Sequence, residues 1–178
     1  RSAAARVADQ PVNSSDPPTH RWDGAEADVS KSLKALVDEL VARWGFVLAT
    51  YRAHVAAEDE VVLPALAARV SNVAHAYELE HEAEDSLFDA ITQALDEAVE
   101  LMATNEGGGP AHTERLQGAI QRAARTAHAT KTALAQHLAK EHAHLVPLMD
   151  DAFAAHEQTA LVERLIASVP GNVVGPVL

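Results

Sequence analysis

The sequence predicts an all-α protein, an up-down four-helix bundle with a truncated first helix and a short extra helix near the C-terminus. Three observations favour this class. Hydrophobic residues make up 48% of the 178 residues, whereas aromatic residues make up only 4%. Alanine supplies about a fifth of the chain, and strong helix formers at that density favour helices over a β-sandwich. Apolar residues also recur in steps of three and four, which is typical of helices in a bundle.

Clusters of turn residues mark the breaks between the expected helices. The stretch PVNSSDPPTHRWDG (residues 11–24) is rich in Pro, Ser and Asp and is expected to be a loop. Asp23 and Glu26 have the spacing of a capping box at the start of a long helix. TNEGGGP (residues 104–110) separates two further helices, and Pro170-Gly171 ends the last one. Helices are expected over residues 1–10, 25–64, 71–103, 111–147 and 157–169, all in a single domain of residues 1–178.

Each of the three long helices carries a stripe of apolar residues that should face the bundle core. Two of these stripes end on a histidine followed by a glutamate, and the middle stripe contains one histidine. The stripes consist of Leu33, Val37, Leu40, Trp44, Val47, Tyr51, His54 and Glu58; of Ala74, Tyr77, His81, Glu84, Phe88, Ile91, Leu95, Ala98 and Met102; and of Leu116, Ile120, Ala123, Ala127, Thr130, Leu134, His137 and Glu141.

The two HxxxE motifs form an internal repeat. His54 to Glu58 and His137 to Glu141 have the same spacing, and a proline follows each glutamate after six residues. Residues four apart share one helix face, so each pair can reach a common metal ion. Two such pairs on facing helices, with His81, would bring three imidazoles and two carboxylates into one core. This donor set is typical of di-iron and di-manganese carboxylate sites.

Composition limits the other function classes. Lys and Arg number 14 against 26 Asp and Glu, a formal charge of −12, which argues against direct nucleic-acid binding and against an anionic membrane surface. The chain has no cysteine, so disulfides, zinc fingers, iron–sulfur clusters and a thiol nucleophile are excluded within it. Apolar runs are shorter than the roughly 20 residues of a membrane helix.

Not every acidic or imidazole group is expected to bind metal. A lone histidine on a helix stripe is more often a hydrogen-bonded core residue, and only the duplicated motif favours the metal interpretation here. Glu84 is left outside the ligand set, because it would point to the bundle end or support a ligand. Asp59 and Glu60 are expected to point outward as solvated charges. His144 lies one turn beyond Glu141 and is a weaker candidate.

Two blocks that contain these residues resemble the haemerythrin-like family, whose four-helix bundle holds two irons in an H…HxxxE…H…HxxxE pattern. The blocks are YRAHVAAEDEVVLPALAARVSNVAHAYELEHEAEDSLFD (residues 51–89) and QHLAKEHAHLVPLMDDAFAAHEQTALVERLIASVPGNVV (residues 136–174). They are most similar to the branch found in plant and green-algal iron-sensing ubiquitin ligases, the BRUTUS or haemerythrin RING zinc-finger group. The resemblance covers most of residues 28–178.

The resemblance implies a role for each matched residue. Glu58 and Glu141 would bridge two iron ions, His54 would bind one of them, and His81 and His137 would bind the other. Zinc or manganese would also be accepted by this donor set. The family pattern has one more histidine on its first helix, and here it is expected just upstream of Arg1. A first helix shortened in this way would expose apolar surface and favour a homodimer.

The resemblance further implies an iron-sensing regulatory module of a larger RING-type ubiquitin ligase, located in the nucleus or cytoplasm, with oxygen as a candidate second signal. The ligase chemistry would belong to a cysteine-rich RING domain outside this chain, so protein partners would be contacted through the parent ligase. Three alternatives remain open at the level of sequence: a di-iron oxidase, peroxidase or ferroxidase; a reversible oxygen carrier; and a helical interaction module without metal.

Overall fold

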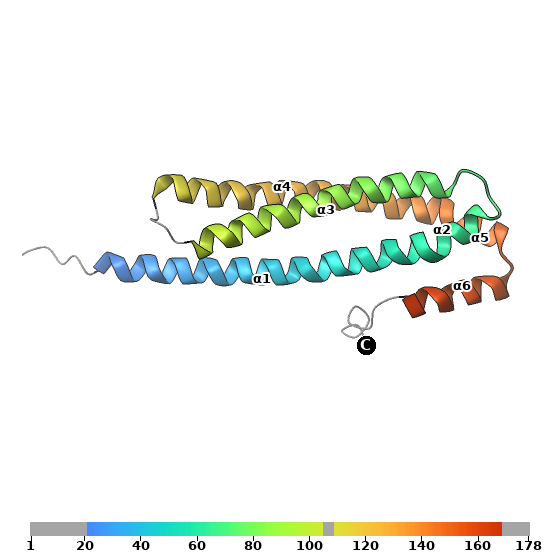
Figure 1. Ribbon diagram of the computed structural model, residues 1–178, viewed down its shortest axis with the longest axis horizontal. Coiled ribbons are helices and arrows are strands. Elements are labelled where there is room, and N and C mark those ends of the chain that lie inside the picture. Colours follow the sequence, from blue (N-terminus) through green and yellow to red (C-terminus); the bar gives the residue numbers. More distant parts are fainter. Residues whose placement is uncertain (1–20, 105–108, 169–178) are drawn as a thin grey trace, which may run out of the picture. The chain divides into compact units, whose positions relative to one another are not determined.

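The computed structural model describes residues 21–104 and 109–168, with side chains from residue 31 onward. The chain divides into two compact units, Arg1–Leu33 and Lys34–Leu178. All the predicted site residues belong to the second unit. The helical elements, labelled in Figure 1, are α1 (Arg21–Ala57), η1 (Glu58–Val62), α2 (Leu63–Ala67), α3 (Ala74–Ala103), α4 (Pro110–Lys140), η2 (Glu141–Leu145), α5 (Val146–Ala152) and α6 (Ala155–Ser168).

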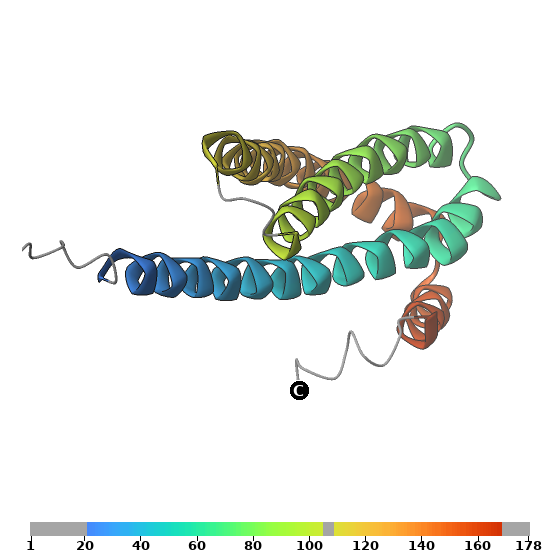
Figure 2. The ribbon, with the colours of Figure 1, turned by 60° about the vertical axis from the view of Figure 1, so that its left-hand side comes forward.

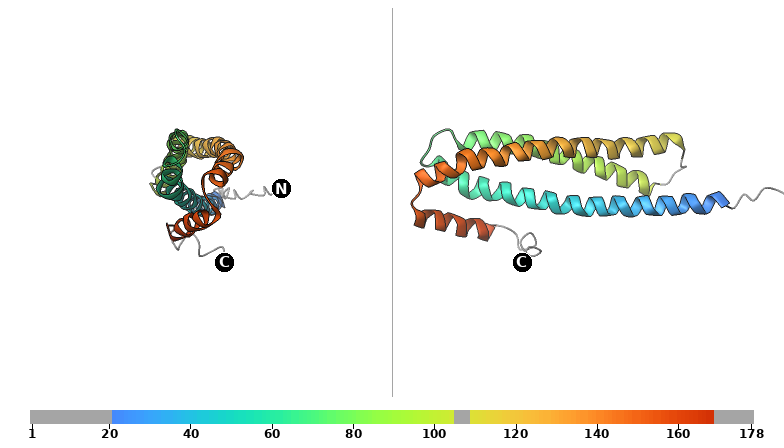
Figure 3. Two further views of the ribbon diagram at one scale, coloured as in Figure 1. Left: turned by 90° about the vertical axis from the view of Figure 1, so that its right-hand side faces the viewer. Right: turned by 180° about the vertical axis from the view of Figure 1, so that it is seen from behind.

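The predicted all-α bundle is confirmed. The chain reverses direction between α1 and α3 and again between α3 and α4, and within the second unit the three long helices lie next to one another in the views of Figure 1 and Figure 2. Contacts between α3 and α4 are the most extensive, and α6 folds back against η1. The view from behind in Figure 3 shows α6 on the same side as the end of α1. No described helix is both long enough and apolar enough to cross a bilayer.

The helix boundaries differ most from the predicted ones at the starts of α1 and α3. Helix α1 begins at Arg21, so the last four residues of the predicted loop are helical. The predicted helix over residues 1–10 and most of that loop lie outside the described residues. Helix α3 begins at Ala74 instead of Ser71, because Asn72 has a φ of 66°. This left-handed conformation is one that Asn tolerates better than most residues, and it ends helical continuity.

Two π-helical turns interrupt the long helices at equivalent places. The first π turn begins at Glu58 and the second at Glu141, and a proline follows each turn after one residue, at Pro64 and Pro147. A proline inside a helix lacks the N–H that would bond the carbonyl four residues back, and its ring clashes with that carbonyl. A wider turn before the proline relieves the clash. The repeated proline therefore explains why both π turns occur where they do.

Apolar clusters along the bundle and at its end hold the second unit together. Along the bundle, Trp44 and Tyr51 stack on Phe88, with ring centroids 5.1 and 3.9 Å apart, and the Trp44 indole donates a hydrogen bond to Thr92. At the end of the bundle, apolar residues from η1, α2, α3, η2 and α6 form a separate cluster. Its buried members are Val61, Val62, Leu63, Leu66, Tyr77, Leu145, Phe153 and Leu161.

The predicted core stripe of α1 is partly wrong. Leu40 and Val47 are 45% and 44% exposed, whereas Val41 and Leu48, one position further along, pack against the α3 side of the core. The buried face of α1 is therefore rotated away from the predicted one. The reason is that α1 packs on α3 with the aromatic side chain of Trp44, which draws the flanking residues toward that helix.

Candidate metal centre

The five predicted ligands lie at the end of the bundle where the long helices change from α to π. His54 occupies the last turn of α1, and Glu58 is the first residue of η1. His137 lies in the last turn of α4, and Glu141 is the first residue of η2. His81 comes from α3. Each of the two glutamates is the first residue of a π turn, so the same type of backbone turn positions both carboxylates.

The polar atoms of these five residues form a continuous series. The two oxygens of Glu58 face different histidines, with Oε1 3.7 Å from His54 Nε2 and Oε2 3.3 Å from His81 Nε2. Glu141 Oε1 lies 3.8 Å from His54 Nε2 and 2.8 Å from His137 Nε2. Each glutamate therefore stands between two histidines, Glu58 through both of its oxygens and Glu141 through Oε1 alone.

A single metal ion could be held by four of these residues. His54, Glu58, His137 and Glu141 each offer one ligand atom, and the four atoms all lie within 4.8 Å of one another. His81 lies outside this group of four but contacts Glu58. The structure thus brings all five residues into one cluster, four of them around a common point.

The donor atoms are buried, and their contacts with one another lack hydrogen-bond geometry. His81 and His137 are 3% and 4% exposed, and Glu58 and Glu141 are 8% and 9% exposed. Among the described residues, the buried nitrogen or oxygen atoms without a hydrogen bond include one ligand atom from each of the five residues, and all nine of these atoms belong to the cluster or its neighbours. Burial of unpaired polar atoms is costly. A bound metal cation would satisfy them.

Charges within the cluster shift the pKa of three of its groups. Burial disfavours the charged form of His81, but the neighbouring carboxylates of Glu58 and Asp59 outweigh burial and raise its pKa to about 9. Contact with the Glu141 carboxylate raises the pKa of His137. For Glu141, burial is outweighed by the neighbouring His137, and the pKa is lowered. A metal ion that bound these nitrogens would therefore displace protons.

Sequence reasoning only partly anticipated the groups around the ligands. Asp59 was predicted to be an outward, solvated charge; its side chain is 41% exposed, but its Oδ1 also lies 2.9 Å from Nδ1 of His81. The Glu84 side chain is buried, and burial raises its pKa, which agrees with the predicted supporting position beside a ligand. Tyr77 is also buried, and its hydroxyl has no partner among the described residues. The sequence signals for this surrounding layer were the carboxylate next to the first HxxxE motif and the one on the His81 stripe.

The remaining described histidines do not join the cluster. The weaker candidate His144 is exposed, as are His75, His128, His142 and His156, while His112 lies at the start of α4, near the opposite end of that helix from His137. The exposed carboxylate Glu60 points away from the ligands, as predicted. The choice of histidines by their position on the apolar helix stripes therefore identified the three that lie in the cluster.

Three proteins from Arabidopsis thaliana match most of the chain. Zinc finger protein BRUTUS is 37% identical over 130 residues, which is 73% of this chain. Two BRUTUS-like zinc finger proteins are 35% and 34% identical over 80% and 83% of it. This chain is similar to one segment of the BRUTUS zinc finger proteins.

The match to BRUTUS proteins confirms the predicted branch of relatives. The chain spans between 9% and 11% of the length of these relatives, so the similarity concerns one segment of each BRUTUS protein. No protein-family model matches the chain, and no solved structure matches it.

Proposed function

We propose that this chain is a haemerythrin-like regulatory domain, extending over residues 1–178, that binds two non-haem iron ions. Glu58 and Glu141 would bridge the ions, His54 would bind one ion, and His81 and His137 would bind the other. Iron held there would supply redox and oxygen-binding chemistry. The observation that carries this proposal is the convergence of two HxxxE motifs, each with its glutamate at the start of a π turn, with buried ligand atoms that form no hydrogen bond.

The similarity to BRUTUS zinc finger proteins supports a place within a larger protein. We propose that the domain is the iron-responsive part of a RING-type ubiquitin ligase in the nucleus or cytoplasm. Iron would act through stability, because a ligand that binds only the folded state stabilises it. Partners and ubiquitination targets would be contacted through the parent protein.

The test is anaerobic loading with Fe²⁺, followed by metal analysis and thermal unfolding. We expect at least one and at most two iron ions per chain, and a higher Tm with iron. The matched control is the variant with His54→Ala, His81→Ala and His137→Ala, which should bind no iron and show the same Tm with and without it. Iron-independent melting of the unaltered chain would contradict the proposal.

The same preparation distinguishes a sensor from an enzyme. The iron-loaded chain is assayed for steady-state oxidase, peroxidase and ferroxidase turnover. A regulatory domain should bind iron with at most a single stoichiometric oxidation. Turnover that scales with bound iron would replace the regulatory proposal with an enzymatic one.

A further inference from the structure

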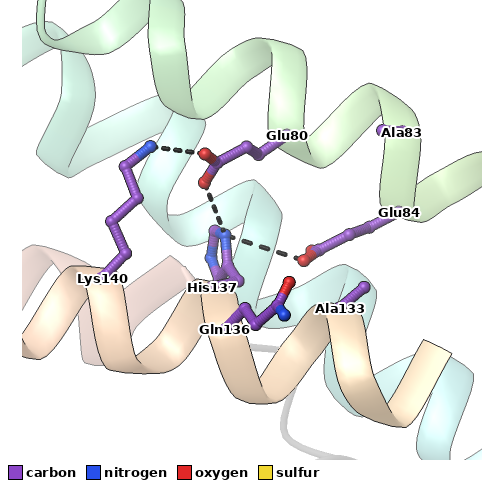
Figure 4. Close-up of a pocket in the computed structure, with 7 residues that line it drawn as sticks. All are labelled: Glu80, Ala83, Glu84, Ala133, Gln136, His137 and Lys140. Atoms are coloured by element: carbon purple, nitrogen blue, oxygen red, sulfur yellow. Dashed lines mark hydrogen bonds and ion pairs between the residues drawn. The ribbon is translucent and has the colours of Figure 1, made fainter. Parts of the chain in front are cut away.

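The outer ring nitrogen of His137 faces two carboxylates on α3. His137 Nδ1 lies 3.4 Å from Glu80 Oε2 and 3.7 Å from Glu84 Oε1. Figure 4 shows both carboxylates reaching from α3 toward this ring, across a cavity of about 240 Å³ between α3 and α4. The inner nitrogen, Nε2, faces Glu141 on the ligand side. His137 is thus held between a ligand carboxylate and two carboxylates on its other side.

The two carboxylates on α3 differ in their surroundings. The Glu80 side chain is 39% exposed, and its Oε1 accepts a hydrogen bond of 2.5 Å from Lys140. Lys140 also lies over the ring of Tyr77, 4.3 Å from the centroid. The Glu84 side chain is 6% exposed, and no described lysine or arginine pairs with it, although the Tyr51 hydroxyl interacts with it. Oε2 of Glu80 and Oε2 of Glu84 both lack a hydrogen-bond partner among the described residues. Glu80 is therefore neutralised by a lysine, whereas the charged partner of Glu84 is the imidazole of His137.

A metal on Nε2 of a histidine leaves the proton on Nδ1. Metal-binding histidines generally donate this N–H to a carboxylate or carbonyl, which fixes the ring and makes the ligand nitrogen more basic. His81 already has this arrangement, because its Nε2 faces Glu58 while its Nδ1 contacts Asp59. His137 needs a comparable acceptor, and Glu84 is the buried carboxylate within reach.

We propose that Glu84 is a positioning residue that accepts the Nδ1–H of His137 when His137 binds metal. This inference rests on the proposed metal-binding function and extends it by assigning one outer carboxylate to each of the two histidines of the same metal position, Asp59 to His81 and Glu84 to His137. Glu80 is bound to Lys140 and closes the outer side of the cavity. The buried charge of Glu84 is then matched by the metal-bound imidazole instead of standing alone.

The test compares Glu84→Gln with the control Glu80→Gln in the full chain. Both variants keep side-chain volume and remove one charge, so neither opens a cavity. Affinity for Fe²⁺, measured anaerobically, and for Co²⁺ is obtained by competition with a chelator. We expect Glu84→Gln to weaken binding by about 10- to 100-fold, with unchanged stoichiometry at saturating metal, and Glu80→Gln to weaken it far less. The visible spectrum of bound Co²⁺ should shift only in Glu84→Gln.

Three outcomes would overturn the inference. Equal affinities and spectra for Glu84→Gln and the unaltered chain would show that Glu84 does not act on His137. Loss of one metal ion per chain at saturation would make Glu84 a ligand itself. A larger effect of Glu80→Gln would transfer the role to Glu80. Absence of metal binding in the unaltered chain would instead refute the proposed function, so the two failures are distinguishable. Thermal unfolding without metal checks that both variants fold.

Discussion

The two HxxxE halves of the molecule share a backbone but differ in burial. In both halves a histidine ends an α-helix, a glutamate begins a π turn, and a proline follows six residues later. The side chain of His54, however, is 38% exposed, whereas that of His137 is 2% exposed. The two motifs therefore have the same backbone geometry, but their histidines differ in exposure to solvent.

The neighbouring helices account for this difference. His137 faces α3, where Tyr77 and His81 pack edge-on and tilted against its ring, with centroids 6.1 and 5.1 Å away. His54 has its ring edge toward His137 at 6.2 Å, and the same face of α1 carries the exposed residues Leu36, Leu40 and Val47. A duplicated motif thus acquires one enclosed ligand and one accessible ligand from its packing partners alone.

The largest effect is expected when the glutamates that the two halves share are substituted. The double variant Glu58→Gln with Glu141→Gln should lose metal binding, because a neutral amide neither bridges two cations nor offsets their charge. Metal should then no longer raise stability, a loss of about 4 kcal/mol at a free metal concentration of 1,000 times the dissociation constant. Thermal unfolding with and without Fe²⁺ measures this difference.

A charge-matched control separates ligand loss from general electrostatics. Glu60→Gln with Glu100→Gln removes the same charge from exposed positions on η1 and α3. Its metal-dependent increase in Tm should equal that of the unaltered chain. An equal loss of metal binding in both double variants would contradict the assignment of Glu58 and Glu141.

The second largest effect tests the difference in burial between the histidines of the two halves. Without metal, His137→Ala should cost about 3 kcal/mol, because it leaves a cavity and a buried Glu141 carboxylate without its partner. His54→Ala should cost less than about 1 kcal/mol, because its side chain is already partly hydrated. Urea unfolding of the metal-free variants gives both values. Similar losses would show that burial does not distinguish the two histidines.

A smaller effect tests whether the prolines set the π turns. Pro64→Ala and Pro147→Ala restore an N–H and remove the ring clash, so the preceding turn can return to α geometry. Rotation of the glutamate should then weaken metal binding by roughly tenfold, or 1.4 kcal/mol, and to the same extent in both variants. Chelator competition measures the affinities, and Pro110→Ala at the start of α4 is the control. Unequal losses would break the equivalence of the two halves.

The smallest effect concerns α6, which covers the end of the first half. Arg69 pairs with both oxygens of Glu157 at 2.6 and 3.1 Å and lies over the Phe153 ring. The Arg69 hydrogen bond lowers the pKa of Glu157 to about 2. A lowered folded-state pKa gives stability that is present above the unfolded pKa of about 4.3 and is lost as pH falls through 2.

Substitution of this glutamate should remove that acid dependence. In Glu157→Gln, the small decrease in Tm between pH 4.5 and pH 2 that this ion pair causes should disappear, and the Tm at pH 7 should be slightly lower than in the unaltered chain, since exposed ion pairs contribute little. Calorimetry across this pH range, with Glu163→Gln as an exposed control on α6, measures the difference. A control that behaves identically would argue against the ion pair.

The sequence predicted the features that depend on local periodicity. Helical spacing located the three long helices, the repeated HxxxE motif identified four of the five clustered residues, and the middle stripe identified His81. Predictions that depend on tertiary packing were weaker. The α1 stripe placed Leu40 and Val47 inside, because helical spacing alone does not say which neighbour the helix packs against. The contact of Asp59 with His81 was missed because it joins η1 and α3, and no spacing along one helix reveals such a contact.

The π turns have a further consequence for the helices that contain them. A helix advances about 100° per residue, so the extra residue in each π turn sets the segments before and after it in different rotational phase. The direction in which the clustered residues of α1 and α4 face is therefore independent of the direction in which the apolar residues of α2 and α5 face. Deleting one residue from η1 would leave the helix continuous, yet it would turn Leu63 and Leu66 out of the cluster beneath α6. The rotational position of the helices at this end of the bundle thus depends on one additional residue in each π turn.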